Sequence, residues 1–266
     1  EIMPSLVGSE MCIRDRRNYR TKMKKAIIMG ASSGIGYELA RLLIAQNWAV
    51  GVAARREDSM EKLRSLAPER VFVARIDIQE EQAVDALHKL IERMKGMDLY
   101  LHVSGIGWQN PALDSERELQ TMQTNVIGFT RMVDAAFHFF SSKGGGHIAC
   151  ITSIAGTMGL GPAPAYSASK AMQSKYLQAL EQLAANRKLN IRFTDIRPGF
   201  VDTPLLGETT HFPMLMKTKD VAKSILRAIE KQRHCYVVDW RWRIVTLLWQ
   251  CIPNWLWRNM RLIKKT

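Results

Sequence analysis

The sequence predicts an α/β protein built on a doubly wound parallel sheet of about seven strands flanked by helices, with an amphipathic helical tail at its C-terminus. From Lys24 onward, short apolar runs alternate with longer segments of helical periodicity. Runs such as AIIMG and HIACITS are apolar without alternation, as is typical of strands covered on both faces. The 266 residues, 47% of them hydrophobic, can form one large domain.

The elements follow one another in regular order. We expect strands at 26–30, 48–54, 71–77, 99–105, 146–153, 190–198 and 235–239, and helices at 35–47, 59–67, 80–94 and 165–185. Ser115, with Glu118 three residues later, predicts a capping box that opens a further long helix. The chain is therefore interpreted as one domain, residues 23–239, followed by a Trp- and Arg-rich tail at 240–266.

Residues 1–22 are interpreted as an artefact. Their run LVGSEMCIRDR matches the translation of a transposon-adaptor end used in library preparation, which reads LVGSEMCIRD and then Ser or Arg. The segment lacks the apolar core of a secretory signal, and the alternative is a natural leader. Met23, which opens MKKAIIMG directly on the first strand, is the expected natural start.

The charge distribution argues against a nucleic-acid partner. Without residues 1–22 the chain keeps 33 basic and 22 acidic residues, a formal charge of +11, and six of the basic residues lie in 240–266. The domain itself is therefore only mildly basic. Cys150, Cys235 and Cys251 show no metal-ligand spacing and are expected to be buried thiols in a reducing compartment.

A glycine-rich turn, GASSGIG, lies where the first strand gives way to the first helix. Gly30 permits the tight turn, Gly34 lets the backbone approach a pyrophosphate, and Gly36 allows close packing of helix on strand. The helix N-terminus then offers free N–H groups and its positive dipole end to phosphate. The position between strand and helix favours a dinucleotide site over an ordinary turn.

The end of the second strand indicates which nicotinamide cofactor is used. An acid there would accept the ribose 2′-hydroxyl, but this chain has Arg55 and Arg56. Guanidinium groups suit a 2′-phosphate, so NADP(H) is favoured over NAD(H). The alternative is that both arginines are only solvated loop residues.

Ser153, Tyr166 and Lys170 form a candidate catalytic set. Tyr166 and Lys170 are four residues apart, so on a helix they share one face. An ammonium beside a tyrosine, with the charge of an oxidised nicotinamide, would lower the pKa of the phenol toward the working range. Ser153 follows the fifth strand, at the edge where open α/β sheets bind ligands, and could hydrogen-bond the reacting oxygen.

Together these motifs resemble the short-chain dehydrogenase/reductase family, from Met23 to about Val238. GASSGIG is similar to its G-x-x-x-G-x-G turn, and Ser153 with Tyr166-x-x-x-Lys170 resembles its catalytic set. The resemblance implies a Rossmann-like fold and makes Asn125 the helix asparagine that holds a water linking the lysine to solvent. It implies cofactor contacts from Gly30, Ser32, Ser33, Gly34, Ile35, Gly36, Arg55, Arg56, Asp77, Ile78, Ser104, Gly105, Tyr166, Lys170, Pro198, Gly199, Val201 and Thr203.

One segment departs from the family pattern. Where the family has NNAG after the fourth strand, this chain has His102-Val103-Ser104-Gly105. Gly105 and Ser104 still permit close approach of a cofactor, but the hydrogen bonds of the paired asparagines are lost. A hydrogen-bonded strand histidine is favoured for His102 over a catalytic base.

The predicted function is an NADP(H)-dependent oxidoreductase that interconverts a ketone or aldehyde and an alcohol by hydride transfer, with no metal. The alternative is a non-catalytic cofactor sensor or scaffold on the same fold. Phe212, Met214, Leu215 and Met216, in the segment 206–219, suggest an apolar substrate. A cytoplasmic homodimer or homotetramer is expected from the family resemblance.

The tail, residues 240–266, contains five of the chain's seven tryptophans, four arginines and two lysines, and no acid. The run 244–252 is too short to span a bilayer. As a helix it would place Arg243, Thr246 and Gln250 on a narrow polar stripe opposite Ile244, Val245, Leu248, Trp249 and Ile252. After Pro253, a second helix would separate Asn254, Arg258, Arg261 and Lys265 from Trp255, Leu256, Met260 and Ile263. Peripheral contact of 240–265 with the inner membrane face is predicted; the alternatives are a subunit contact or a roof over the substrate pocket.

Overall fold

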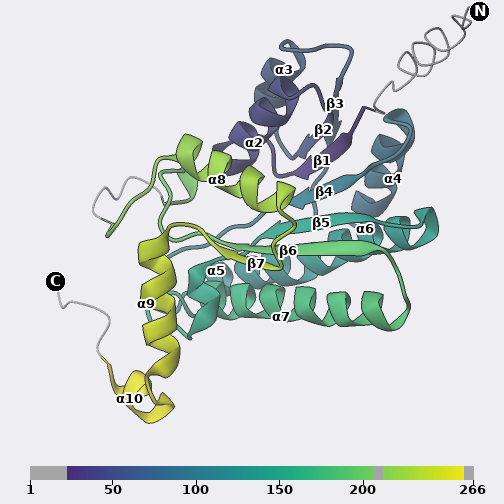
Figure 1. Ribbon diagram of the computed structural model, residues 1–266. Helices are drawn as coiled ribbons and strands as arrows, with labels where there is room; N and C mark the ends of the chain where they lie inside the picture. The colour runs from purple at the N-terminus through teal and green to yellow at the C-terminus, as the bar shows by residue number, and fades with distance from the viewer. Residues whose placement is uncertain (1–22, 207–211, 261–266) are drawn as a thin grey trace, which may run out of the picture.

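The predicted parallel sheet is present in the computed structural model, which describes residues 23–206 and 212–260 (Figure 1). All seven strands run parallel in the order β3-β2-β1-β4-β5-β6-β7. They are β1 (Lys25–Met29), β2 (Ala49–Ala54), β3 (Val71–Arg75), β4 (Leu99–His102), β5 (Gly146–Ile151), β6 (Ile191–Arg197) and β7 (Cys235–Val237). The strand order reverses between β1 and β4, and this switch point is where such sheets bind ligands.

Helices cover both faces of the sheet (Figure 1). They are α2 (Gly34–Ala45), α3 (Asp58–Arg64), α4 (Ala83–Arg93), α5 (Ser115–Met122), α6 (Phe129–Lys143), α7 (Pro164–Asn186), α8 (Thr218–Glu230), α9 (Trp240–Cys251) and α10 (Asn254–Asn259). Side chains of α2, α3, α8 and α9 share one buried cluster. Those of α4, α6 and α7 share the cluster on the opposite face. The two clusters explain why the strand runs lack alternation, since both faces of the sheet are dry.

The strands end earlier than the sequence predicts at the edge that faces the glycine-rich turn. The predicted strand 99–105 stops at His102, because the N–H groups of Val103 and Ser104 both donate to the carbonyl of Met29. The predicted strand 146–153 stops at Ile151, and Ser153 instead caps a 3₁₀ turn, Ile154–Thr157. Both segments leave the sheet just where candidate site residues begin.

The predicted capping box at Ser115 is wrong. Asp114 is the N-cap residue of α5, and its carboxylate accepts hydrogen bonds from the N–H groups of Glu116 and Arg117. Glu118 does not fold back on the helix start. Its carboxylate accepts from the side chain of Asn110 and from the N–H of Ala165, both at 2.8 Å. Glu118 therefore ties α5 to the first turn of α7.

The expectation of three buried thiols holds only for Cys150, because Cys235 and Cys251 are exposed. Cys235 lies on β7, the edge strand, and Cys251 ends α9.

The tail forms two short helices separated at Pro253, as predicted, but its buried face differs from the prediction. Thr246 is not part of a polar stripe. It is buried, and its hydroxyl donates to the carbonyl of Trp242 at 2.9 Å. Arg261, Ile263 and Lys265 lie outside the described residues. Within residues 23–206 and 212–260, no helix has the length and apolar character needed to cross a membrane.

Candidate active site

The candidate site lies at the carboxyl ends of β1, β4, β5 and β6, where four loops meet (Figure 1). The parallel register brings the loop after each strand to the same edge of the sheet. These loops carry the glycine-rich turn, the segment 103–107, Ser153 and the segment 198–203. Sequence-distant candidates thus gather at one place, as the fold class requires.

The glycine-rich turn is packed so tightly that two of its glycines admit no side chain. A Cβ atom on Gly30, whose φ is +99°, would lie 2.6 Å from the backbone nitrogen of Ser104. A Cβ atom on Gly36 would lie 2.1 Å from the carbonyl oxygen of Gly30. Ser33, the N-cap residue of α2, makes no side-chain cap hydrogen bond. The first N–H groups of α2 therefore keep their capacity for an anionic ligand.

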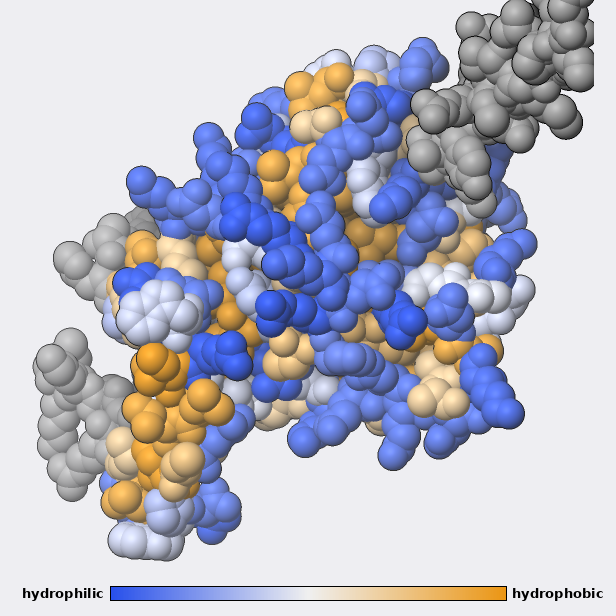
Figure 2. Space-filling model, viewed as in Figure 1, coloured by the Kyte–Doolittle hydropathy of each residue, from blue (hydrophilic) through white to orange (hydrophobic). Residues whose placement is uncertain are grey.

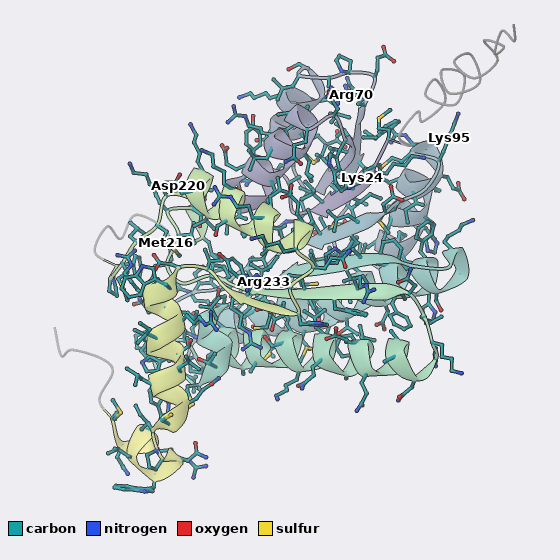
Figure 3. All side chains as sticks on the ribbon, viewed as in Figure 1. Lys24, Arg70, Lys95, Met216, Asp220 and Arg233 are labelled. Atoms are coloured by element: carbon teal, nitrogen blue, oxygen red, sulfur yellow. The ribbon has the colours of Figure 1, made fainter. Side chains whose placement is uncertain are left out.

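A cleft of about 760 Å³ borders this turn. Its lining includes Ser32, Ser33 and Gly34 on one side and residues at the start of α8, among them Lys217 and Asp220, on the other (Figure 3). The cleft does not include Tyr166. The cleft reaches the N-terminus of α2, where the free N–H groups and the tight glycine turn fit the phosphates of a dinucleotide.

The other predicted cofactor contacts surround the turn. Arg55 and Arg56 are exposed just beyond β2. Ile78 is buried, and the carboxylate of Asp77 accepts a local hydrogen bond from the N–H of Gln79 at 3.1 Å. Thr203 lies against Gly34, since a Cβ atom on Gly34 would be 3.1 Å from the methyl group of Thr203.

The segment Pro198–Thr203 connects the loop that carries Ser153 with the glycine-rich turn. The carbonyl of Pro198 accepts hydrogen bonds from the N–H of Ile154 at 3.1 Å and from the hydroxyl of Ser153 at 3.5 Å. Val201 forms an isolated parallel bridge with Met216, which lies just before α8 (Figure 3). Gly199 lies against the indole of Trp242, whose nitrogen would be 2.3 Å from a Cβ atom at that position.

Tyr166 and Lys170 lie one turn apart on α7, as predicted. The ring of Tyr166 packs on the backbone of Gly107, because a Cβ atom there would come within 2.2 Å of the ring. Burial raises the pKa of Tyr166, and a hydrogen bond with Ser153 opposes that rise. The expected lowering of this pKa by the nearby ammonium is not seen in the protein alone. The nitrogen of Lys170 lies 5.8 Å from the ring centroid.

Lys170 is buried and its ammonium is fixed by two acceptors. Its Nζ donates to the carbonyl of Ile151 at 3.1 Å and to Oε1 of Gln173 at 3.0 Å. Burial lowers the pKa of Lys170 to about 8, although the charge of Asp195 acts in the opposite direction. A lysine in this environment can gain and lose a proton near neutral pH.

Asn125 lies in a π-helical turn, Gln123–Gly128, between α5 and α6. Its side chain is held by Ile106, accepting from the N–H at 2.9 Å and donating to the carbonyl at 2.7 Å. A second donation reaches the hydroxyl of Ser169 at 3.1 Å. Such π turns are frequent at functional sites because they misalign one backbone carbonyl from the helical ladder.

The carbonyl of Asn125 accepts a hydrogen bond from Nε2 of Gln173 at 2.8 Å. Gln173 therefore bridges Asn125 and Lys170 directly, at the place where the resemblance implies a water. The sequence analysis missed Gln173. Its position three residues after Lys170 on the same helix is the only available signal, and Gln173 is completely buried.

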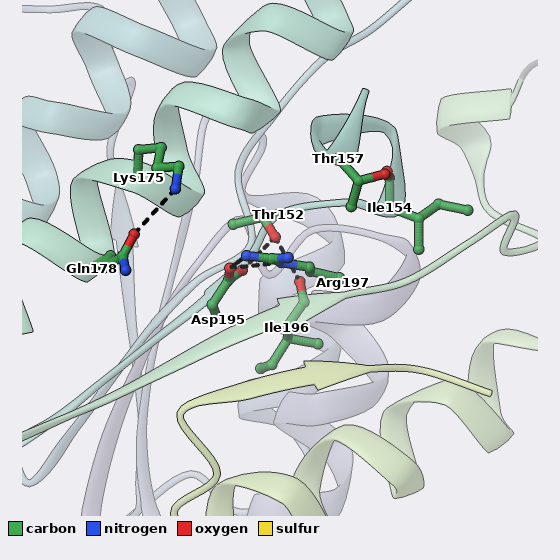
Figure 4. A network of polar contacts seen from close by, with 8 residues as sticks. All are labelled: Thr152, Ile154, Thr157, Lys175, Gln178, Asp195, Ile196 and Arg197. Atoms are coloured by element: carbon green, nitrogen blue, oxygen red, sulfur yellow. Dashed lines mark hydrogen bonds and ion pairs between the residues drawn. The ribbon is translucent and has the colours of Figure 1, made fainter. Parts of the chain in front are cut away.

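A second polar network joins the end of β5 to β6 (Figure 4). The hydroxyl of Thr152 donates to the carboxylate of Asp195 at 2.5 Å, and the guanidinium of Arg197 pairs with the same carboxylate at 2.7 Å. Thr152 directly precedes Ser153, so the network fixes the backbone that carries the serine. Sequence reasoning missed it, because nothing in the chain pairs Thr152 with residues more than 40 positions away.

His102 is a buried, hydrogen-bonded strand histidine, as the sequence analysis favours. Its Nδ1 lies 3.1 Å from the hydroxyl of Tyr100, and its ring meets that of Phe129 edge-on. Burial, and to a smaller extent the charge of Lys170, lowers the pKa of His102 to about 3. His102 is therefore neutral at physiological pH and places no positive charge near the ammonium of Lys170. Gly105 lies close to that lysine, with only 3.4 Å between Nζ and a Cβ atom at Gly105.

A row of aromatic side chains begins in the segment Pro198–Thr203 and continues along α9 to α10. Phe200 stacks on Phe212 at 4.6 Å between ring centroids and meets Trp242 edge-on at 5.6 Å. The row continues through Trp249 to Trp257. The indole N–H of Trp257 then donates to the carbonyl of Gly159 at 2.8 Å. The inner face of α9 and α10 thus joins the loop after β6 to the loop between Ser153 and Tyr166.

Comparison with known proteins agrees with this architecture. A family model described as short chain dehydrogenase matches residues 24–213. An uncharacterized oxidoreductase of Myxococcus xanthus is 31% identical over 245 residues, which cover 89% of this chain and 94% of that protein. A short chain dehydrogenase from Burkholderia cenocepacia in complex with NADP superposes with a TM-score of 0.74 at 22% identity, covering 87% of this chain and 98% of that one.

A 3-ketoacyl-(acyl-carrier-protein) reductase from Brucella melitensis complexed with NADH gives a TM-score of 0.72 at 23% identity, covering 81% of this chain and 96% of that one. These two structures show the likeness of the fold. Because the family model matches most of the chain and an oxidoreductase is related over nearly its whole length, this chain belongs to the short-chain dehydrogenase family and is an enzyme of that family.

Proposed function

We propose that the protein is an NADP(H)-dependent oxidoreductase that interconverts a ketone or aldehyde and an alcohol. The observation that carries the proposal is the convergence of Ser153, Tyr166 and Lys170 beside a glycine turn too tight for side chains. A non-catalytic sensor on this fold would need none of the three. A panel of ketones, aldehydes and acyl-ketones, followed by oxidation of NADPH, tests the proposal, and activity on no carbonyl would favour the sensor.

The roles of the side chains follow from their surroundings. When bound, the nicotinamide supplies or accepts the hydride. Ser153 holds the reacting oxygen by a hydrogen bond from its hydroxyl. Tyr166 donates a proton to that oxygen in the reductive direction, and its raised pKa keeps the phenol protonated before reaction. Lys170 favours the phenolate that remains and resupplies its proton.

Gln173 is proposed as a positioning residue for Lys170. Its amide oxygen accepts from the ammonium while its amide nitrogen is fixed on the carbonyl of Asn125. A side chain thus links Asn125 and Lys170 in this protein, where the family resemblance implies a water. A hydrogen bond to the ammonium favours the charged form, so Gln173 holds the pKa of Lys170 higher than burial alone would leave it.

We expect reductive turnover to fall as the pH rises through about 8, because Lys170 then loses its charge. Gln173→Met should move this alkaline limb to lower pH, since the ammonium loses an acceptor, while turnover below the limb stays near that of the wild type. The measurement is kcat for carbonyl reduction between pH 6 and 10.

The matched control is Gln178→Met. Lys175 and Gln178 form the same Lys–Gln pair, three residues apart on α7 and at 3.3 Å, but on the exposed surface (Figure 4). This control should leave the pH profile unchanged. A Gln173→Met profile that coincides with that of the wild type would show that Gln173 has no part in setting the charge of Lys170.

The preference for NADP(H) is supported by Arg55 and Arg56, which are exposed directly after β2. The strand β2 itself contains no acid that could bind a ribose 2′-hydroxyl. Their replacement, Arg55→Ala with Arg56→Ala, should raise the KM for NADPH by about tenfold to a hundredfold, the usual range for losing hydrogen bonds to a charged group. The KM for NADH should hardly change. Arg41→Ala with Arg64→Ala removes two other exposed arginines and is the control; an unchanged NADPH-to-NADH preference in the first variant would exclude a 2′-phosphate site there.

An apolar substrate is proposed from the aromatic row and the segment before α8. Met214, Met216 and Phe200 pack on the core, which leaves Leu215 and Phe212 as candidates to meet a substrate. A cytoplasmic location and a homodimer or homotetramer stay predictions, as does the division of the chain into a domain at 23–239 and a tail at 240–266.

A further inference from the structure

We propose that the outer face of α9 and α10 docks this protein on the surface of a membrane that contains anionic lipid. The outer face is defined by large apolar side chains that no described residue covers: Trp240, Ile244, Leu247, Leu248, Trp255, Leu256 and Met260. The contact is monotopic, with the helices lying in the interface. It is independent of the reaction proposed above.

The helix α9 is apolar on two opposite sides. Its inner side is buried in the domain, where Trp242 is 3% exposed. At about 100° per residue, Trp240, Ile244, Leu247 and Leu248 fall within an arc of about 100° on the other side. Leu248 is 62% exposed. The outer side is therefore an apolar surface that no described residue covers, and a large exposed apolar surface of this kind marks an interaction site.

The helix α10 extends the same surface. Trp257 points inward, and its hydrogen bond to Gly159 fixes the orientation of this short helix against the domain. The same orientation leaves Trp255 70% exposed, with Leu256 and Met260 exposed beside it. Figure 2 shows the apolar side chains as a continuous orange area over α9. Tryptophans thus stand on both helices of the outer face, as in segments that lie at a membrane interface.

The charged residues of α9 and α10 themselves are all basic. Arg243 and Arg258 are exposed, and residues 240–266 contain no acid. Arg241 is paired with Asp239, at the very start of α9. Arginine side chains that flank an apolar face can extend to lipid phosphates while the apolar groups enter the headgroup boundary.

The same charges argue against a second copy of this chain as the partner. A twofold contact through the outer face would bring four arginines, Arg243 and Arg258 of each copy, onto one interface, with no acid in the segment to compensate. Anionic headgroups supply the missing negative charge. The twelve residues of α9 are too few to cross a bilayer, so the contact stays at the surface.

The test is flotation of the full chain with phosphatidylcholine vesicles, with and without phosphatidylglycerol. The wild type should float with the anionic vesicles. Ile244→Ser with Leu247→Ser and Leu248→Ser should reduce the bound fraction at least about tenfold. Leu66→Ser with Leu119→Ser removes exposed leucines from other helices and loops and should float like the wild type.

The charge contribution is tested by Arg243→Gln with Arg258→Gln, which should weaken binding to anionic vesicles by about thirtyfold, at about fivefold per cation. Melting temperature and NADPH binding confirm that each variant is folded. The proposal would be overturned by a wild type that stays in the soluble fraction with both vesicles, or by a triple variant that floats as well as the wild type. In the first case, the oligomeric state of both proteins is compared, to see whether the triple substitution dissociates a wild-type oligomer. Such a dissociation would assign the outer face to a second copy.

Discussion

Replacing Tyr166 with phenylalanine should reduce turnover at least about a hundredfold, the usual scale for losing a general acid–base group, while NADPH still binds. The substitution removes only the hydroxyl. The ring that packs on Gly107 remains, so the loop 103–107 and the cofactor cradle keep their positions. The reacting oxygen would then keep the hydrogen bond from Ser153, but it would lack the group that transfers a proton to it, because the ammonium of Lys170 is held by Ile151 and Gln173.

Tyr176→Phe is the matched control on the same helix. Its hydroxyl donates to Asp134 at 2.5 Å, outside the candidate site, so its loss should leave turnover close to that of the wild type. Initial rates of NADPH oxidation with a carbonyl substrate from the panel measure turnover, and nucleotide fluorescence measures binding. If the Tyr166→Phe enzyme retained full activity, the acid–base mechanism would have to be abandoned.

The sequence predicts those parts of the fold and the site that depend on local patterns. The parallel sheet follows from apolar runs without alternation, and the structure confirms it. The glycine turn, Ser153 and the Tyr166–Lys170 pair could be predicted because residues close in sequence, on one turn or one helix, have fixed relative positions. The prediction extends β4 three residues too far, because apolar Val103 and small Ser104 fit a strand pattern. In the structure their N–H groups donate to the carbonyl of Met29 as the chain leaves the sheet.

Residues whose roles depend on distant partners could not be predicted. Gln173 contacts Asn125, 48 positions away, and Asp195 contacts Thr152, 43 positions away. Glu118 suggested a capping box, but tertiary contacts with Asn110 and Ala165 claim its carboxylate. Periodicity also gave one apolar face for α9 where the structure has two, because a pattern of apolar residues does not show which side the domain covers.

Gly36→Ala should lower NADPH affinity about tenfold or more and reduce the melting temperature by several degrees. The new Cβ atom would lie 2.1 Å from the carbonyl oxygen of Gly30, which is backbone and cannot rotate away. Either α2 moves off β1 or the turn opens, and overpacking of this kind typically costs about 1–3 kcal/mol. Both movements displace the helix N-terminus that would hold the cofactor phosphates.

Gly161→Ala is the control for this prediction. A Cβ atom at Gly161 would meet nothing within 4 Å, so this variant adds the same methyl group without a clash. Thermal unfolding with and without saturating NADPH separates the two effects, because a bound cofactor raises the melting temperature only of a protein that binds it. The wild type and Gly161→Ala should both gain stability from NADPH, and Gly36→Ala should gain much less. An equal gain in all three proteins would mean that the glycine turn does not hold the phosphates, and the cofactor site would have to be sought elsewhere along the sheet edge.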